Sequence, residues 1–380
     1  MSVIVPSKKV AIVTEYLISP GGADRVLLDL LQIFPKATVY TAVFNEENYK
    51  GILSGVKTTF LQKITNGKQM RGLNILTPIA FESLDLREYD LIISLSAGSA
   101  KGIIPHIHQK NISIILTPPR YQWEGELNMR KSPFYGIFRF FSNFVSHYFR
   151  IWDVSVVSRI DHFVSISNYI QKKVKKIYGV DSEVIYPGIR KYMFKKVSKS
   201  SQTKLLKKYD LPSHFFLVVS RLYDYKRIER AIIAAKNTGK NLVIIGEGPD
   251  QPFLEQIAGN SEKIRFLGRI KDDEEVHVLF SSAQAVLFCG VEDFGIVPVE
   301  AMACGVPVIA FGEGGVTETV VAGETGEFFK NTEELTEILS KFSKKKFSKE
   351  NLVNRAKIFT SERFKNNFKN YLQKIYEAEK

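Results

Sequence analysis

Residues 290–318 read GVEDFGIVPVEAMACGVPVIAFGEGGVTE and carry the pattern that decides the fold. Pro298 suits the first turn of a helix, and Gly305 followed by Pro307 is typical of a helix end. The apolar run 308–311 then leads into a glycine-rich turn. We therefore expect a strand, a loop, a short helix, a second strand and a turn, an alternation typical of an α/β domain with a parallel sheet.

Two glutamates in this stretch, Glu292 and Glu300, stand eight residues apart, with Gly295 between them. The expected elements place Glu292 in the loop and Glu300 on the first turn of the helix, beside backbone N–H groups that can hold an anion. Taken alone, the pair is compatible with acid–base catalysis, with binding of a polar ligand, or with a helix cap and a surface acid.

The composition favours a globular chain with a basic surface. The 380 residues, 44% of them hydrophobic and 24% charged, suggest about two domains. The 53 Lys and Arg side chains against 40 Asp and Glu give a net charge of +13, and residues 1–190, with 23 against 15, contribute +8. This excess favours an anionic partner such as phosphate, nucleic acid or an acidic membrane, although a solubilising charge would give the same count.

The two cysteines, Cys289 and Cys304, both lie in apolar surroundings. We expect buried, reduced thiols rather than a disulfide, and hence a cytoplasmic chain. Lys8 and Lys9 interrupt the short apolar start, so no signal peptide is expected. No apolar run approaches the ~20 residues of a membrane-spanning helix, so any contact with the inner face of a membrane would be peripheral.

The first half begins with the apolar strand KVAIVT, residues 9–14, followed by a loop and an amphipathic helix over 23–34. Gly21 and Gly22 in that loop are typical of a doubly wound domain in which a ligand approaches the backbone. The spacing is not GxGxxG, so a nicotinamide dehydrogenase is disfavoured. Further strands are expected at 38–43, 91–94, 112–116, 162–165 and 183–186, with a helix at 167–178.

Residues 130–159 differ because aromatic and basic side chains crowd them. The segment contains Phe134, Tyr135, Phe138, Phe141, Phe144, Tyr148, Phe149 and Trp152, interspersed with Arg130, Lys131, Arg139 and Arg150. Aromatic residues at helical spacing are usually core, which favours a core helix. A helix at a membrane interface, or one lining a groove for a lipid-facing acceptor, is the alternative.

A change in composition suggests the domain boundary. Residues 191–208 are basic, polar and weakly periodic, which favours a linker. After them, strands are expected at 215–219, 242–245, 264–266 and 285–288. The expected fold class is therefore α/β, with two Rossmann-like domains in tandem, 1–190 and 209–360. We expect the C-terminal helix, about 361–380, to pack back on the first domain.

Arg221 and Lys226 stand five residues apart, between the end of an expected strand and the start of a helix. Ligands of open α/β sheets bind at that edge, and a guanidinium with an ammonium suits a diphosphate. The next strand ends in IIGEGPD, residues 244–250, whose glycines allow a nucleotide to approach closely. Each signal is weak alone, since surface cations and glycine turns are common.

The combination and order of these features resemble one family. A GG loop after the first strand, the Arg221 and Lys226 pair, a glycine turn and two glutamates around EDFGIVPVE are together similar to the retaining glycosyltransferases of family four (group 1), which have the GT-B fold. The resemblance implies an active site in the cleft between two domains and a nucleotide-sugar donor. It also implies no metal ion or other cofactor, and a front-face reaction in which the leaving phosphate helps to deprotonate the acceptor.

Carried over residue by residue, the resemblance assigns roles on the donor side. Arg221 and Lys226 would bind the diphosphate and offset its charge as it leaves, and Glu292 would contact the sugar hydroxyls as the third member of the catalytic set. Glu300 would hydrogen-bond the ribose. The other donor-binding positions implied are Gly21, Gly22, Gly246, Glu247, Gly248, Arg269, Ile270, Phe294, Gly295, Ile296 and Val297.

The first domain departs from the family at one position. Many relatives carry a histidine after the strand at 112–116, where this chain has Leu116 followed by TPPRYQWE. That stretch resembles the TPxRYxWD segment of O-antigen-type mannosyltransferases. The candidates for contact with the acceptor or with the donor sugar are therefore Arg120, Tyr121, Trp123 and Glu124. A rigid loop that packs its own aromatic rings is the alternative.

No metal site is expected. His106 and His108 are close in sequence, but no cysteine or acidic residue joins them at ligand spacing.

We therefore predict transfer of a hexose from a GDP- or UDP-linked sugar, with mannose from GDP-mannose as the first choice, to a glycan or lipid-linked acceptor. Peripheral contact with an anionic membrane is compatible with this activity, and no nucleic-acid partner is expected. The alternatives are a GT-B sugar phosphorylase or epimerase, and a catalytically silent protein that binds a nucleotide-sugar or a membrane.

Overall fold

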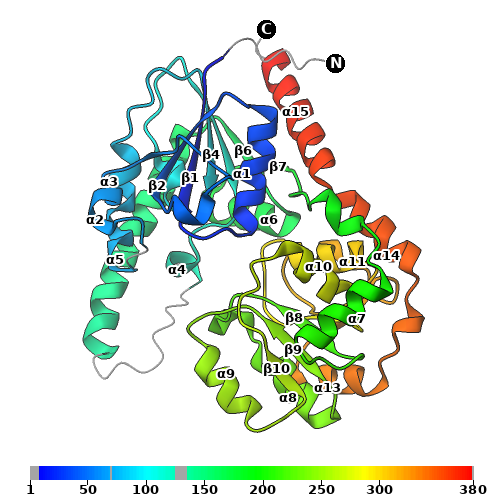
Figure 1. Ribbon diagram of the computed structural model, residues 1–380. Coiled ribbons are helices and arrows are strands. Elements are labelled where there is room, and N and C mark those ends of the chain that lie inside the picture. Colours follow the sequence, from blue (N-terminus) through cyan, green and yellow to red (C-terminus); the bar gives the residue numbers. More distant parts are fainter. Residues whose placement is uncertain (1–7, 69–70, 125–134, 379–380) are drawn as a thin grey trace. The chain divides into compact units, whose positions relative to one another are not determined.

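The computed structural model describes residues 8–68, 71–124 and 135–378. The chain divides into two compact units, which Figure 1 shows in colours that follow the sequence. Unit 1 comprises residues 1–187 and 364–380, and unit 2 comprises residues 188–363. The end of the chain therefore groups with its first half.

Within the described residues, unit 1 is built on a parallel sheet of seven strands in the order β3-β2-β1-β4-β5-β6-β7. The strands are β1 (Val10–Leu17), β2 (Thr38–Phe44), β3 (Lys57–Thr58), β4 (Leu91–Ser96), β5 (Lys110–Ile115), β6 (His162–Ser165) and β7 (Glu183–Val184). The helices are α1 (Gly22–Ile33), α2 (Leu61–Thr65), α3 (Thr77–Glu82), α4 (Arg120–Trp123), α5 (Tyr135–Ser155), α6 (Asn168–Tyr178) and α15 (Ser361–Ala378), whose first three residues fall in unit 2. The order reverses between β1 and β4, as in a doubly wound sheet.

The central strands of this sheet are buried on both faces. Ile92 and Ile93 of β4 point to opposite faces of the sheet, and neither has any exposed surface. This burial explains the uninterrupted apolar runs that predict these strands, because a sheet with one wet face would show alternation instead. The two-residue strand β3 was not predicted, since two residues show no period.

Within the described residues, unit 2 is built on a parallel sheet of six strands in the order β10-β9-β8-β11-β12-β13. The strands are β8 (Phe216–Val219), β9 (Leu242–Ile245), β10 (Ile264–Phe266), β11 (Val286–Phe288), β12 (Val308–Phe311) and β13 (Gly326–Phe329). The helices are α7 (Lys199–Lys208), α8 (Glu229–Thr238), α9 (Gln251–Ala258), α10 (Asp273–Ser282), α11 (Ile296–Ala303), α12 (Val316–Thr319), α13 (Thr332–Lys341) and α14 (Lys349–Ala356). The predicted fold class, two α/β units with parallel sheets, is confirmed.

The segment 191–208, expected to be a linker, has regular structure and groups with unit 2. Its second half is the helix α7, whose N-cap Ser198 accepts a hydrogen bond from the backbone N–H of Ser201 (3.0 Å). Leu205 is buried, and α7 packs against α10. The many lysines made this segment look like a linker. A short apolar side is enough to stabilise a helix when a neighbouring helix covers that side.

The aromatic segment lies partly outside the described residues, which resume at residue 135. From there it forms α5, which has both a buried and an exposed side: Asp153 is fully buried, whereas Phe144 and Ile151 are each 54% exposed. The interpretation as a core helix therefore holds for one side of α5 only. Among the described helices, none combines the length and the apolar character needed to cross a bilayer.

Two glycines of the turn after β9 are required by packing against the turn after β8. A Cβ built on Gly246 would lie 1.8 Å from the carbonyl oxygen of Ser220, and one built on Gly248 would lie 2.2 Å from that of Leu222. The N–H of Leu222 also donates to the carbonyl of Glu247 (2.9 Å). The glycines predicted to admit a nucleotide thus admit the protein's own backbone.

Gly248→Ala should lower the free energy of unfolding by about 2–3 kcal/mol, because a Cβ pressed on backbone cannot be relieved by a rotamer change. The melting temperature of the chain measures this. Gly21→Ala is the matched control, since a Cβ there would meet only the Ser19 carbonyl at 3.9 Å and the backbone is extended at φ −153°. Its loss should stay below about 0.5 kcal/mol. Equal losses for the two variants would contradict this distinction between the glycines.

Candidate functional site

The carboxyl ends of the strands of unit 2 lie along one edge of the sheet, because all the strands are parallel. Arg221 follows β8, Gly246 follows β9, Arg269 follows β10, and Gly290 opens the loop after β11. The predicted donor residues of unit 2 therefore gather at the edge where open α/β sheets bind their ligands.

Lys226 and Glu292 form an ion pair between Nζ and Oε1, with only 15% and 21% of their side chains exposed. Gly290 makes their approach possible, since a Cβ there would lie 2.6 Å from the Tyr225 carbonyl oxygen and 2.8 Å from the Lys226 Cα. The short 3₁₀ helix that carries Lys226 (Asp224–Lys226) thus packs directly on the loop that carries Glu292. In the absence of a ligand, the two charges neutralise each other.

Arg221 differs from Lys226 in its exposure. It lies at the surface, and its guanidinium carbon stands 5.5 Å from the centroid of the Tyr223 ring. The edge therefore offers one half-buried ammonium and one exposed guanidinium from the same turn. A fork-shaped donor and a point charge together suit the several oxygens of a diphosphate.

The helix α11 begins at Gly295, whose φ of +88° is a conformation that residues with a side chain rarely adopt. The N–H groups of Ile296 and Val297 lie in the first turn, where helical N–H groups lack carbonyl partners within the helix. Phe294 is buried with its ring 5.5 Å from that of Phe359, so its side chain belongs to the core.

Glu300 is buried, with 5% of its surface exposed, and it is the fifth residue of α11. The expectation that it lies on the first turn is therefore wrong by one residue. The helix starts two residues before Pro298, because the conformation of Gly295 turns the chain there. Pro298 is tolerated at the third position, where no N–H is needed within the helix.

Arg190 is a neighbour of Glu300 that sequence reasoning missed. Its Nη2 donates to Asp273 Oδ1 (2.9 Å), and its guanidinium carbon lies 4.8 Å from the centroid of the Tyr192 ring. Burial disfavours the charge of Arg190, but the bonds to Asp273 and the nearby carboxylates, Glu300 among them, outweigh burial and raise its pKa. No local signal reveals a partner 83 residues away.

Gly21, in the loop after β1 of unit 1, has open space where a side chain would stand. Gly21 is exposed and caps the N-terminus of α1, and its N–H donates to Asp24 Oδ2 (2.6 Å). The same carboxylate oxygen accepts from the Tyr49 hydroxyl (2.8 Å). Neither the conformation nor the packing of Gly21 excludes a side chain. The open space beside this glycine could therefore accommodate a ligand.

The predicted acceptor residues separate into two kinds. Trp123 donates from Nε1 to Asp153 Oδ2 (2.8 Å), and Glu124 pairs with Lys173 of α6. These two side chains hold α4 in place, as the alternative of a packed loop implies. Tyr121 is 58% exposed, and Arg120 is half-buried, so the ligand-facing candidates reduce to these two.

Asp153 is the centre of a buried polar group that anchors α4. Besides Trp123, its Oδ2 accepts from the Tyr178 hydroxyl (2.9 Å), and its Oδ1 pairs with Lys101. The side chains of Lys101 and Asp153 are 1% and 0% exposed. A buried charge pair of this kind is tolerated only when each partner neutralises the other.

At the Leu116 position, the backbone N–H donates to the Ser96 carbonyl (2.8 Å) and the side chain is buried. The hydroxyl of the same Ser96 donates to Oε1 of Glu15 in β1 (3.3 Å). The same Oε1 accepts from the N–H of Ala100 (2.9 Å), and burial raises the pKa of Glu15. Sequence reasoning missed Glu15, although a carboxylate directly after the apolar run 9–14 could have indicated it.

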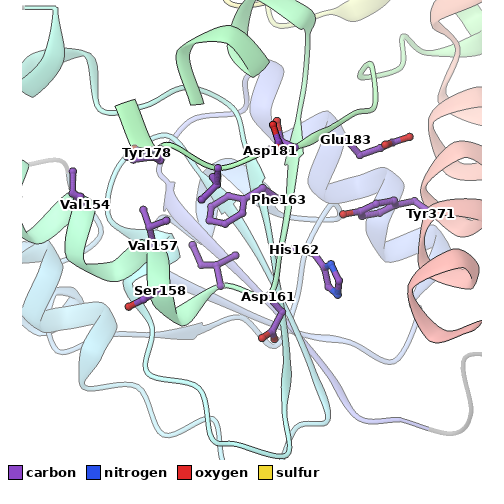
Figure 2. A pocket seen from close by; sticks show the side chains of 13 residues that line it. Val154, Val157, Ser158, Asp161, His162, Phe163, Tyr178, Asp181, Glu183 and Tyr371 are labelled. Carbon is purple, nitrogen blue, oxygen red and sulfur yellow. The ribbon is translucent and has the colours of Figure 1, made fainter. Parts of the chain in front are cut away.

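A hollow of about 720 Å³ lies elsewhere in unit 1 (Figure 2). It is lined by the residues that begin β6 and β7, including His162 and Glu183, and by Tyr371 of α15. Figure 2 shows Tyr371 and Val154 on opposite sides of it. The hollow lies at the amino ends of the strands and does not contain the predicted site residues.

The thiols are as predicted: Cys289 and Cys304 are both buried and unbonded to each other, and burial raises the pKa of each to about 12. In the described part of the chain, no three or more His, Cys, Asp or Glu side chains are grouped so that they could hold a metal ion.

Residues 201–359 match the family model described as glycosyl transferases group 1. This part of the chain, less than half of its length, is similar to that family, and we call it the glycosyl transferase domain. It contains Arg221, Lys226, Glu292 and Glu300, which all lie in unit 2. The match supports the resemblance recognised in the sequence for this part of the chain.

Curated relatives of the glycosyl transferase domain include several bacterial enzymes. An N-acetyl-alpha-D-glucosaminyl L-malate synthase of Bacillus anthracis is 29% identical over 187 residues, 47% of each chain. An O-antigen chain mannosyltransferase of Salmonella typhimurium is 30% identical, over 43% of this chain and 45% of its own. A GDP-mannose-dependent alpha-(1-6)-phosphatidylinositol monomannoside mannosyltransferase of Mycobacterium tuberculosis is 30% identical, over 45% and 50%. The chain thus spans about half the length of the curated relatives it matches.

Solved structures show the same fold over nearly the whole chain. The Anabaena HepE protein in complex with UDP-glucose has a TM-score of 0.71 at 18% identity, covering 96% of this chain and 99% of its own. Sucrose-phosphate synthase from Thermosynechococcus elongatus has a TM-score of 0.73 at 17% identity, covering 97% and 100%. These likenesses show that the chain has the GT-B fold.

Lys226→Ala should weaken binding of a nucleoside diphosphate and raise the reaction barrier by about 3–4 kcal/mol, as loss of a charge-stabilising donor does. Glu292→Gln should leave diphosphate binding unchanged or tighter, because Lys226 loses its internal competitor, while turnover of the nucleotide-sugar falls. Calorimetric titration and initial rates measure the two effects, with Lys236→Ala on α8 as the control. If both site variants weakened diphosphate binding equally, the pair would act only as a structural unit.

Asp153→Asn should lower the free energy of unfolding by about 3–5 kcal/mol, because it leaves the Lys101 ammonium buried without its partner. Tyr121→Ala should cost less than about 0.5 kcal/mol, as an exposed position allows. Thermal unfolding of the two variants provides the comparison. A stable Asp153→Asn protein would refute the anchoring role of this carboxylate.

Proposed function

We propose that this protein is a retaining hexosyltransferase that uses a nucleotide-sugar donor. The observation that carries the proposal is the pairing of Lys226 with Glu292 beside the start of α11 at the carboxyl edge of unit 2, inside the group 1 glycosyl transferase domain. The cation suits the diphosphate of such a donor, and the carboxylate suits its sugar hydroxyls. The helix N-terminus suits the phosphate of that diphosphate that carries the sugar.

In this proposal the protein acts mainly by electrostatic stabilisation. Arg221 and Lys226 bind the diphosphate and offset the charge that develops as it leaves. Its arrival draws Lys226 away from Glu292, whose oxygens then accept hydrogen bonds from the sugar hydroxyls. Glu300 accepts from the ribose hydroxyls. The leaving phosphate takes the acceptor proton on the face it departs from, so neither glutamate moves a proton.

The remaining predicted donor-binding residues would contribute in three ways: through backbone contacts, through contact with the base, and through the shape of a turn. We propose backbone contacts for Gly295, Ile296 and Val297, and a contact of Arg269 and Ile270 with the base. We propose that Gly246 and Gly248 act by shaping the turn on which Arg221 sits, since the backbone of that turn fills the space beside them.

GDP-mannose is the proposed donor and a glycan or lipid-linked molecule the proposed acceptor. The names of the Salmonella and Mycobacterium relatives support mannose, and the latter supports GDP. The HepE structures contain UDP or UDP-glucose, which makes a UDP-linked sugar the competing choice. Arg120 and Tyr121 are the proposed acceptor contacts, and the proposed setting is the cytoplasm at the inner face of a membrane.

The test is a thermal-shift panel of GDP, UDP and ADP with their sugars, followed by NMR of the product. Binding to the folded state alone raises the melting temperature, so GDP and GDP-mannose should give the largest shifts. Glu300→Gln should reduce the shift with each nucleotide by removing a charged acceptor. The product should keep the anomeric configuration of the donor. No shift with any nucleotide would refute the function, and an inverted product would refute the mechanism.

A further inference from the structure

Arg190 belongs to a segment at the beginning of unit 2 that packs against the start of α11. The N–H of Ile189 donates to the Phe359 carbonyl (2.9 Å), and the Phe359 ring lies 5.5 Å from that of Phe294, close to the first turn of α11. The short 3₁₀ helix that follows Arg190 (Lys191–Phe194) also contacts α11. The backbone of this segment is therefore held beside that helix.

From this segment, the side chain of Arg190 reaches α10. Its Nη2 donates to Asp273 Oδ1 (2.9 Å), and its Nη1 pairs with Oδ2 of the same carboxylate. Two bonds from one guanidinium to one carboxylate fix the orientation of both groups as well as their separation. Asp273 is the first residue of α10, and the proposed base contacts, Arg269 and Ile270, lie in the segment directly before it. Arg190 therefore holds the end of that segment.

The ring of Tyr192 restrains the guanidinium of Arg190 in this position. The guanidinium carbon lies 4.8 Å from the centroid of the ring. The same ring meets the ring of His277 on α10 edge-on, with centroids 5.8 Å apart, and His277 is buried. A guanidinium beside an aromatic ring that packs on a buried residue loses much of its freedom to swing into solvent.

Glu300 is the third part of this arrangement. The helices α10 and α11 lie side by side in Figure 1 and are in contact. Burial disfavours the charge of Arg190, but the bond to Asp273 and the nearby negative charges, Glu300 among them, outweigh burial and raise its pKa. The Nε of Arg190 is enclosed, and no described residue accepts a hydrogen bond from it. Folds tolerate an enclosed donor of this kind mainly at functional sites.

The bridge between Arg190 and Asp273 is too exposed for a contribution to stability to be its main effect. The two side chains are 39% and 58% exposed. Ion pairs with this exposure contribute little to the free energy of unfolding. The geometry of the bridge, which joins the segment before α10 to the flank of α11, is therefore its more important property.

We infer that Arg190 is a positioning residue of the donor site, which holds the proposed base contacts and the proposed ribose contact at one fixed separation. One nucleotide can then reach Arg269 and Glu300 at the same time. Selectivity for ribose over deoxyribose is the property that this separation controls. The inference rests on the proposed function, from which the roles of Arg269 and Glu300 are taken.

The test is calorimetric titration of the full chain with GDP and 2′-deoxy-GDP, and with UDP and 2′-deoxy-UDP. The unchanged protein should bind its preferred ribonucleotide about tenfold more tightly than the deoxy form, which lacks one hydrogen bond to a charged group. Arg190→Gln should reduce this ratio to about twofold, because the two contacts are no longer held together. Arg190→Lys should restore the ratio only in part, since an ammonium keeps the charge but lacks the fork.

Asp273→Asn removes the bridge from its other end and should reduce the ratio as Arg190→Gln does. Because Asp273 is exposed, this variant also provides the test if Arg190→Gln does not fold. The double variant should show no larger reduction than either single variant, since both changes break one interaction. Arg265→Gln is the matched control: Arg265 pairs with Asp210 (3.4 Å), with exposures of 46% and 95%, and its loss should leave the ratio unchanged.

The outcomes separate the inference from the proposed function. An unchanged ratio in Arg190→Gln and Asp273→Asn would overturn the inference and leave the function standing. Equal weakening of the ribose and deoxyribose forms, with a lower melting temperature, would reduce Arg190 to a structural role and overturn it as well. Equal affinity of the unchanged protein for both forms would refute the ribose contact of Glu300 and the inference with it. No binding of any nucleotide by the unchanged protein would refute the proposed function itself.

Discussion

The common direction of the strands is the constraint on which the candidate site depends. A strand in a parallel sheet must be followed by a crossover, so every strand delivers its carboxyl end and the loop after it to the same edge. In unit 2 this brings together residues from the loops after β8, β9, β10 and β11. The pairing of Lys226 with Glu292 follows from this arrangement, because β8 and β11 are adjacent strands.

Glycine serves two physical purposes in this chain, and the sequence does not distinguish them. Gly246, Gly248 and Gly290 have backbone atoms of neighbouring loops where a Cβ would stand, so they allow the loops at the edge to pack on one another. Gly21 has open space in the same position. The first kind allows the loops of unit 2 to pack, and the second leaves open space at the N-terminus of α1 in unit 1.

Two ion pairs of the fold differ in how deeply they are buried. Lys101 and Asp153 are fully buried, and Asp153 also binds Trp123 of α4, so solvent does not reach either partner. Lys226 and Glu292 are only partly buried, so an anionic ligand can compete for the ammonium. The free energy needed to separate a charge pair falls as the pair becomes more exposed. The first pair is therefore suited to stabilising the fold, and the second is compatible with the ligand binding that we propose.

The sequence by itself determined the fold class, most strands, the buried thiols and the resemblance to the family. Apolar runs, glycine turns and the spacing of Arg221, Lys226, Glu292 and Glu300 are local patterns. The sequence did not determine that 199–208 is a helix, that Glu300 lies beyond the first turn of α11, or that α5 is buried on one side only. It also did not reveal Arg190 or Asp153, or that Trp123 anchors its loop. Each of these depends on which residues distant in sequence meet in space, and only the tertiary structure decides that.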